Sequence, residues 1–217
     1  ANVNQFLRWD AITTGTHRGD IDSLETQENR AILRVQNAAA TVTLNGQLSG
    51  AGGFQKDGEG TLVLTNTNNT ADNADAFRVN DGTLVIAATG ADNSFATNIY
   101  NDAFVYLGDG VTMGQRVQFV NGTAEGGVKT FGLQPGAAAA TMNGDRLNFN
   151  TDNDGTDGSI EIFAGDGGVL TINSQLRDNN GNEPAQGFTK VGNGTVILTN
   201  ATNSYGDGAV SYTHLTL

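Results

Sequence analysis

A five-residue segment that returns at a short offset constrains the fold of this chain more than any other feature. Gly60–Leu64 reads GTLVL, and Gly82–Ile86 reads GTLVI 22 residues later. Alternate side chains of an extended strand share one side, so Leu62 and Leu64 face the same way. Repeats at intervals of about 20 to 50 residues are typical of solenoids and propellers. We therefore expect stacked strands in register, with Leu62 beside Leu84.

A longer copy of the same region lies far downstream. GFQKDGEGTLVLTN at 53–66 aligns without a gap with GFTKVGNGTVILTN at 187–200. Both copies lead into a stretch rich in Asn and Thr, residue types that favour turns because they bond their own backbone. The offset of 134 residues is close to six times 22, so we expect about six coils between the copies.

Short alternating segments separated by Gly, Asn and Asp run through the rest of the chain. Together with the 22-residue offset they favour an all-β, single-stranded parallel β-helix with coils of about 22 residues, rather than a sandwich or barrel. Ser94–Tyr100 and Ala137–Met142 have room for a short helical turn. Further strands are expected at 31–35, 40–48, 77–79, 104–107, 116–120, 129–133, 146–149, 159–163 and 169–173.

The chain divides into three parts. Residues 1–29 are expected to form a capping segment, because terminal repeats cover an open core. Residues 30–209 are expected to form the β-helix, with repeat motifs at 53–87 and 187–208 and a projecting loop at Asp178–Pro184. Residues 210–217 interrupt the pattern and resemble translated adaptor sequence, so we expect a non-native tail there.

Charge and composition narrow the range of partners. The chain has 23 acidic against 11 basic residues, a net charge of −12, and no cysteine. A strongly acidic chain disfavours nucleic acid and anionic membranes, which require a basic surface. No run of about 18 apolar residues occurs, so we expect no insertion of this fragment into a membrane.

The two motif copies resemble the autotransporter-associated β-strand repeat, also called the passenger-associated transport repeat. The resemblance rests on Lys56, Gly58 and Gly60 and on the matching Lys190, Gly192 and Gly194. It implies a right-handed parallel β-helix from a Gram-negative bacterium, anchored to the outer membrane or shed from the cell surface. It also implies an outer-membrane translocator barrel elsewhere in the full chain, and no common activity.

Catalytic constellations are scarce in this sequence. The histidines are His17 and His214, cysteine is absent, and neither G-x-S-x-G nor H-E-x-x-H occurs. A histidine-dependent triad is therefore disfavoured, and we assign no catalytic residue. Chemistry of the glycosidase or lyase type would need convergent carboxylates, although acidic residues are also common in turns. The candidates are Asp145, Asp152, Asp154 and Glu161.

The segment 150–161, NTDNDGTDGSIE, is the most metal-like string. It matches several oxygen-ligand positions of a calcium loop, but its flanks alternate like strands and its first position is Asn, so an EF-hand is excluded. A looser calcium site at a corner of the stack would use Asp152, Asp154 and Asp157. The competing interpretation is an ordinary solvated turn.

Two further features have a functional and a structural interpretation. Arg18-Gly19-Asp20 matches an integrin-binding tripeptide, but a match of three residues often arises by chance. Aromatic residues in alternating strands could form a platform for sugars, and we expect instead that they pack in the core. These residues are Phe104, Tyr106, Phe119, Phe131 and Phe149.

The sequence thus predicts a non-enzymatic surface or secreted protein fragment, acting as a stalk or adhesive scaffold without a cofactor. Its expected partners are surface ligands of host or neighbouring cells, or polysaccharide. One alternative is a carbohydrate-active enzyme, which would show a groove of carboxylates and exposed aromatic residues on adjacent coils. The other is a calcium-stabilised scaffold.

Overall fold

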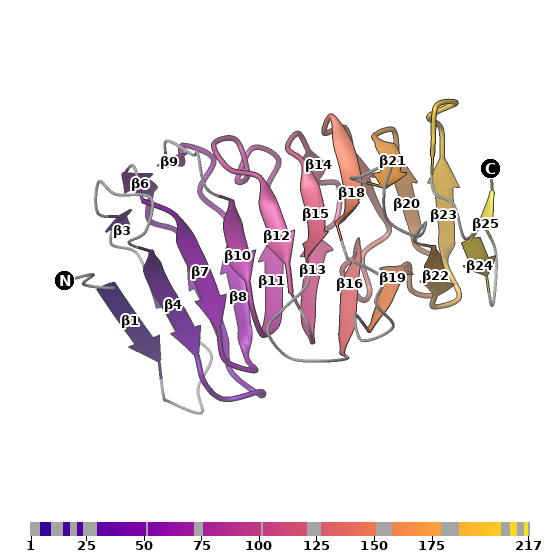
Figure 1. The fold of residues 1–217 in the computed structure, drawn as a ribbon. Coiled ribbons are helices and arrows are strands. Elements are labelled where there is room, and N and C mark those ends of the chain that lie inside the picture. The colour runs from indigo at the N-terminus through magenta and orange to yellow at the C-terminus, as the bar shows by residue number, and fades with distance from the viewer. Residues whose placement is uncertain are drawn as a thin grey trace.

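The structure is a computed structural model in which every regular element is a β-strand (Figure 1). Strand pairs in register are parallel throughout the described part. No helix in that part is long and apolar enough to cross a membrane. The described residues are 5–9, 15–17, 21–23, 30–50, 52–71, 76–100, 102–120, 127–150, 158–178, 187–204, 209–211 and 215–216.

The strands form three sides of a stack. Sheet A contains β1 (Gln5–Trp9), β4 (Ala31–Val35), β7 (Phe54–Asp57), β10 (Phe77–Val79), β12 (Thr97–Ile99), β15 (Val117–Val120), β18 (Arg146–Asn150) and β21 (Gln175–Asp178). Sheet B contains β2 (Gly15–His17), β5 (Thr41–Leu44), β8 (Thr61–Leu64), β11 (Gly82–Ile86), β13 (Ala103–Leu107), β16 (Val128–Leu133), β19 (Ser159–Phe163), β22 (Phe188–Val191) and β24 (Ala209–Ser211).

The third side is divided between two smaller sheets. Sheet C contains β3 (Ile21–Ser23), β6 (Leu48–Gly50) and β9 (Thr70–Ala71). Sheet D contains β14 (Thr112–Met113), β17 (Ala139–Met142), β20 (Val169–Ile172), β23 (Thr195–Leu198) and β25 (Leu215–Thr216). Between them the chain passes through turns at 88–94.

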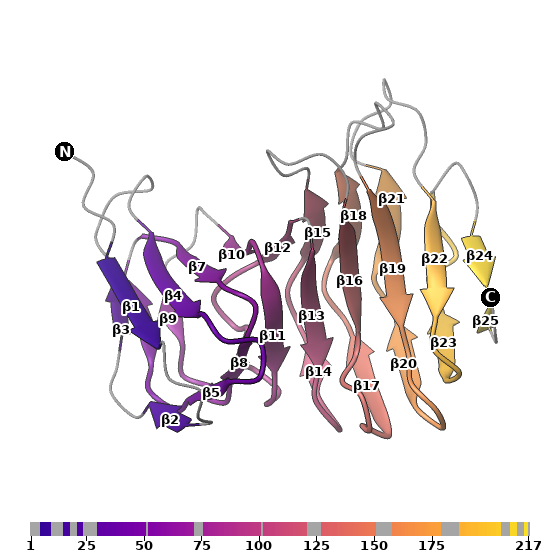
Figure 2. The ribbon, with the colours of Figure 1, turned by 90° about the horizontal axis from the view of Figure 1, so that it is seen from below.

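The chain visits the sides in the same order in successive coils, and each strand pairs with its counterpart one coil later (Figure 2). Leu62 pairs with Leu84 and Leu64 with Ile86, which confirms the register predicted from the sequence. The architecture is that of the parallel β-helix, and parallel connections within one sheet are right-handed in nearly all proteins. Residues 1–29 contribute β1, β2 and β3, and residues 209–216 contribute β24 and β25.

The length of a coil is less regular than the sequence predicts. One coil takes 20 residues from Thr41 to Thr61 and 22 from Thr61 to Thr83, but 31 from Lys129 to Ile160. The longer coils have longer connections from sheet A to sheet B, at 121–127, 151–158 and 179–187. Twenty-two residues therefore describe only part of the stack.

The spacing of the two motif copies also differs from the prediction. The first copy forms β7 and β8, in sheets A and B, whereas the second forms β22 and β23, in sheets B and D. In sheet B, five steps rather than six separate β8 from β22, and the second copy is advanced by one side. The motif therefore specifies a corner between two strands and no particular side of the stack.

The segments with room for helical turns contain strands instead. β12 lies within 94–100 and β17 within 137–142, and both extend existing sheets. Hydrogen bonding to the neighbouring coils therefore overrides the weak local preference.

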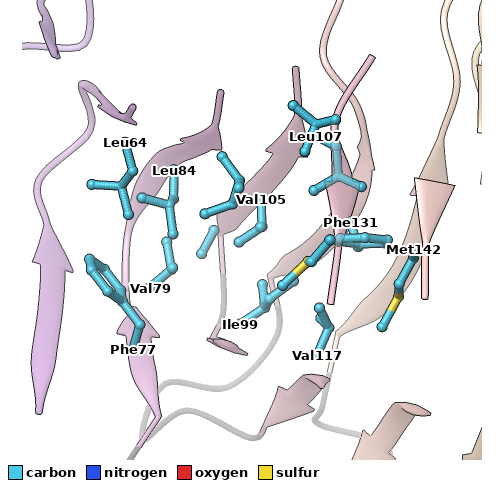
Figure 3. Packing of buried hydrophobic residues seen from close by; sticks show 14 of the residues in the cluster. Leu64, Phe77, Val79, Leu84, Ile99, Val105, Leu107, Val117, Phe131 and Met142 are labelled. Carbon is cyan, nitrogen blue, oxygen red and sulfur yellow. The ribbon is translucent and has the colours of Figure 1, made fainter. Parts of the chain in front are cut away.

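Side chains from the three sides meet in a continuous apolar interior (Figure 3). Leu84, Val105 and Phe131 are fully buried in successive coils of sheet B, and Ile99 and Met142 approach from the other sides. The intervening residues of each strand face outward, so every coil supplies both core and surface. One coil cannot bury its own apolar side, so the stack is stable only as an array.

Candidate functional site: corners and outer faces of the stack

The lysines of the repeated motif are buried at corners of the stack. Lys56 and Lys190 have no exposed surface, and each Nζ donates a hydrogen bond to the carbonyl of Gly58 or Gly192, two residues further on. Lys56 Nζ also donates to Asp81 O at 2.8 Å. Burial lowers the pKa of Lys56 to about 8, although the nearby carboxylate of Asp81 acts in the opposite direction. These lysines therefore hold the corners together and face no ligand.

The motif glycines are required by the same corners. Gly58 and Gly192 both have φ of 79°, in the left-handed region that favours glycine. A Cβ atom on Gly58 would lie 2.5 Å from Val35 O, and one on Gly192 would lie 2.3 Å from Ala164 O. The backbone of the preceding coil thus leaves no room for a side chain at either position.

The Asn/Thr-rich stretch after each motif forms a second type of corner that bonds to the preceding coil. Asn66 Nδ2 donates to Asn45 O at 2.8 Å, and Asn69 Oδ1 accepts from Leu48 N at 2.8 Å. The corner was predicted, but its bonds to another coil were not. The second copy repeats these two bonds with Asn200 and Asn173 at 3.2 Å and with Asn203 and Leu176 at 2.9 Å.

Asp92 occupies the turn segment that interrupts the third side. Its side chain is fully buried, and Oδ2 accepts hydrogen bonds from Gly114 N at 2.9 Å and Gln115 N at 3.0 Å. Oδ1 is buried without a hydrogen-bond partner in the described part. Burial raises the pKa of the Asp92 carboxyl above its usual value of 3.8. The carboxyl thus joins two coils where no strand does so.

The two predicted ligand sites lie outside the described residues. These are the tripeptide Arg18-Gly19-Asp20 and the calcium candidates Asp152, Asp154 and Asp157. Among the residues that the structure describes, no group of three His, Cys, Asp or Glu side chains could hold a metal ion. Both predictions therefore remain predictions.

The described carboxylates proposed for a carbohydrate-active enzyme lie on different sides of the stack. Asp145 directly precedes β18 of sheet A and pairs with Arg146, at 3.1 Å between Oδ2 and Nε. Glu161 faces outward from β19 of sheet B. These two groups do not form the facing pair that glycoside hydrolysis requires.

The prediction that the aromatic residues are core is correct for three and wrong for two. Phe119, Phe131 and Phe149 are buried, whereas Phe104 and Tyr106 lie partly exposed on the outer face of sheet B. The repeat itself contained this information. An advance of 21 residues aligns buried Leu84 with Val105, so Phe104 and Tyr106 take outward positions with Thr83 and Val85.

An aromatic patch forms on this outer face around a glycine. We define it as Phe104, Tyr106 and Phe163. Ring centroids lie 6.2 Å apart for Phe104 and Tyr106 and 5.7 Å apart for Tyr106 and Phe163. Gly132 pairs with both Tyr106 and Phe163, and a Cβ there would lie 2.4 Å from Phe163 O. The two rings therefore cover a strand position where no side chain fits.

Polar groups beside the patch are few. Glu161 lies on the same strand as Phe163, and its Oε2 is 3.5 Å from Thr130 Oγ1. Burial, and secondarily the charge of Glu161, raise the pKa of Tyr106 to about 12, so its hydroxyl stays protonated at neutral pH. The patch can contact a flat apolar surface, with one carboxylate at its edge.

The three outer faces differ in chemistry. Sheet D presents uncharged side chains, with Thr112, Thr141, Thr171 and Ile197 in one row. Outward positions of sheet B with known burial are mainly Thr, Val and the aromatic patch, and sheet A presents arginines and amides. Such segregation is absent from the linear sequence.

Comparison with known proteins relates this parallel stack to autotransporter adhesins. The chain is 34% identical over 104 residues to the BmaC autotransporter adhesin of Brucella suis biovar 1 (strain 1330). The match covers 48% of this chain and 3% of the adhesin, so the chain spans only a small part of its relative.

No protein-family model matches the chain, and no solved structure matches it. The relationship to an autotransporter is therefore supported over about half of the chain. The finer assignment to the β-strand repeat family remains a prediction based on the motif.

Proposed function

We propose that the chain is a segment of a bacterial surface passenger protein, in which a non-enzymatic β-helix acts as stalk and adhesive scaffold. The observation that carries this proposal is the similarity to an autotransporter adhesin, in a chain whose coils all stack along one axis. The same similarity supports a location at the Gram-negative outer membrane or cell surface.

The physical properties of the stack suit this role. Each coil contacts mainly its neighbours, so coils can fold one after another once the chain has left the cell. The chain has no cysteine whose premature oxidation could block export. Extended faces with different chemistry give a scaffold several surfaces for contact.

Surface display tests the proposal directly. The chain would be placed between a signal peptide and an autotransporter translocator in a non-adherent Gram-negative strain, with the same vehicle lacking the chain as control. We expect protease-accessible display and stronger attachment to cultured cells or matrix-coated surfaces. Retention inside the cell would contradict the surface role, and display without stronger attachment would contradict the adhesive role.

Calcium stabilisation is a second proposal, and the string of oxygen donors at Asp152, Asp154 and Asp157 supports it. Bound calcium would raise the melting temperature, because a ligand that binds only the folded state stabilises it. Addition of EDTA should then lower the melting temperature, and calcium in excess should restore it. An unchanged melting temperature would exclude this proposal.

A further inference from the structure

The solvent-facing arginines of this acidic protein gather on one of its three sides. Of the basic side chains whose burial is described, the three lysines and Arg30 are buried. Every other arginine in that set is partly exposed on, or at the edge of, sheet A, whose strands lie side by side along the stack (Figure 1). These residues are Arg34, Arg78, Arg116, Arg146 and Arg177.

The register of sheet A arranges these side chains in rows parallel to the stack axis. Val117 pairs with Leu147, which places Arg116 beside Arg146 in one row. A second row begins and ends with arginine and contains only amide side chains between them. Its members are Arg78, Asn98, Gln118, Asn148 and Arg177.

The rows are long enough to follow an extended polymer. Neighbouring strands lie about 4.8 Å apart, so the four steps from Arg78 to Arg177 span about 19 Å. Guanidinium groups and amide N–H groups alternate over this distance, and both donate hydrogen bonds to anionic oxygens.

Few carboxylates oppose these arginines. Asp57 lies at the N-terminal end of the sheet, where it binds Arg34 at 3.0 Å and accepts from Gln55 at 3.0 Å. Asp145 is paired with Arg146. From β10 to β18, the outward strand positions with described burial hold only arginine, amide and aliphatic side chains.

The local charge of this face matters more than the net charge of −12. The Debye length is about 8 Å at physiological ionic strength, so carboxylates on the other two sides are largely screened from a ligand lying on sheet A. A ligand there experiences the arginine rows first. Arginine also suits carboxylate and sulfate groups, because its planar guanidinium can bind two oxygens at once.

We infer that the outer face of sheet A binds a linear acidic polysaccharide that lies along the stack axis. This inference deepens the proposed adhesive role by naming a ligand class. Single-stranded nucleic acid fits less well, because its binding surfaces combine cations with stacking aromatic rings, and here the aromatic patch lies on sheet B. A flat anionic membrane would also meet the acidic corners on both edges of the sheet.

The test compares two variants of equal net charge. In Arg78→Gln/Arg116→Gln/Arg177→Gln the face loses three cations, and in Thr141→Glu/Thr171→Glu/Thr195→Glu the same charge change occurs on sheet D. Binding of the purified full chain to heparin and to polygalacturonate is measured at 150 mM salt, with neutral dextran as the negative probe. Circular dichroism and thermal unfolding verify that both variants are folded.

We expect the arginine variant to bind about tenfold more weakly, since three exposed ion pairs are each worth about twofold in affinity. The sheet D variant should stay within about twofold of the unaltered chain, and higher salt should weaken binding of the unaltered chain. Equal losses in both variants, or no binding by the unaltered chain, would overturn the inference. Stronger binding of single-stranded DNA than of polygalacturonate would reject the polysaccharide as ligand.

Because this assay uses soluble protein and purified glycans, its failure leaves the surface-display experiment unaffected. Conversely, a displayed chain that adheres equally well with and without the three arginines would retain its adhesive role and lose this ligand.

Discussion

At the residue scale, the polar side chains that distinguish this sequence serve mainly to join coils. Lys56, Asn69 and Asp92 are buried, and each bonds to backbone groups at a corner of the stack. A buried polar group without a partner would cost stability, so these bonds explain why such residues occur inside an apolar stack. Two of them titrate with shifted pKa values, which makes their role measurable.

Lys56 should make the protein more stable at alkaline pH. Its folded-state pKa of about 8 lies below the ordinary 10.5, so between these values the unfolded chain holds a proton that the folded chain has released. Stability therefore rises with pH in this window, by about 3 kcal/mol at 1.36 kcal/mol per unit. Urea unfolding at pH 7.5 and pH 10 should show this rise in the unaltered chain and a smaller one in Lys56→Met. An equal rise in both proteins would contradict the role of Lys56.

Asp92 should act in the opposite direction at acidic pH. Its raised pKa means that the folded chain keeps a proton that the unfolded chain has released above 3.8. This contribution to stability is fully present below pH 3.8 and is lost as pH rises through the folded-state pKa. Asp92→Asn keeps an acceptor for Gly114 N and should abolish that loss in urea titrations from pH 3.5 to 7. If the variant retained the same pH slope, the carboxyl would not be its origin.

At the scale of elements, the unit that the sequence repeats is a corner with its two flanking strands. The same corner joins sheets A and B in one copy and sheets B and D in the other. In both copies the lysine Nζ bonds the carbonyl of the left-handed glycine. The corner therefore has a local conformation that does not depend on which side of the stack it follows.

Substitution of corner glycines should separate backbone strain from steric overlap. Gly192→Ala adds a Cβ 2.3 Å from Ala164 O, whereas Gly110→Ala has a similar φ of 70° and no atom within 4 Å. Both variants incur about 1 kcal/mol of left-handed strain, and only the first also forces two coils apart. We expect Gly192→Ala to have the clearly lower melting temperature. Equal melting temperatures would show that the close approach is not required.

At the scale of the whole molecule, stability is distributed along the stack. Phe131 of β16 is fully buried and lies between Val105 of β13 and Ile162 of β19. The coils far from it share no contact with this side chain, as expected for a one-dimensional array. Damage to one coil should therefore remain local.

Phe131→Ala tests this distribution. The cavity should cost about 3 to 5 kcal/mol, because large-to-small changes in a packed core lose both burial and contacts. Hydrogen exchange should become faster in β13, β16 and β19 and stay nearly unchanged in β4 and β7. Uniformly faster exchange along the chain would indicate a single cooperative unit and contradict the nearest-neighbour description.

The sequence by itself determined the parallel stack, the pairing of Leu62 with Leu84 and the corner motif. These depend on local features, namely alternation within a strand and glycines that only one backbone conformation suits. Only the tertiary structure decided which residues share a face. Coils vary from 20 to 31 residues, so spacing in the sequence cannot tell that the second motif has moved by one side or that Arg78 and Arg177 stand in one row. The side to which a residue belongs depends on the accumulated length of every connection before it.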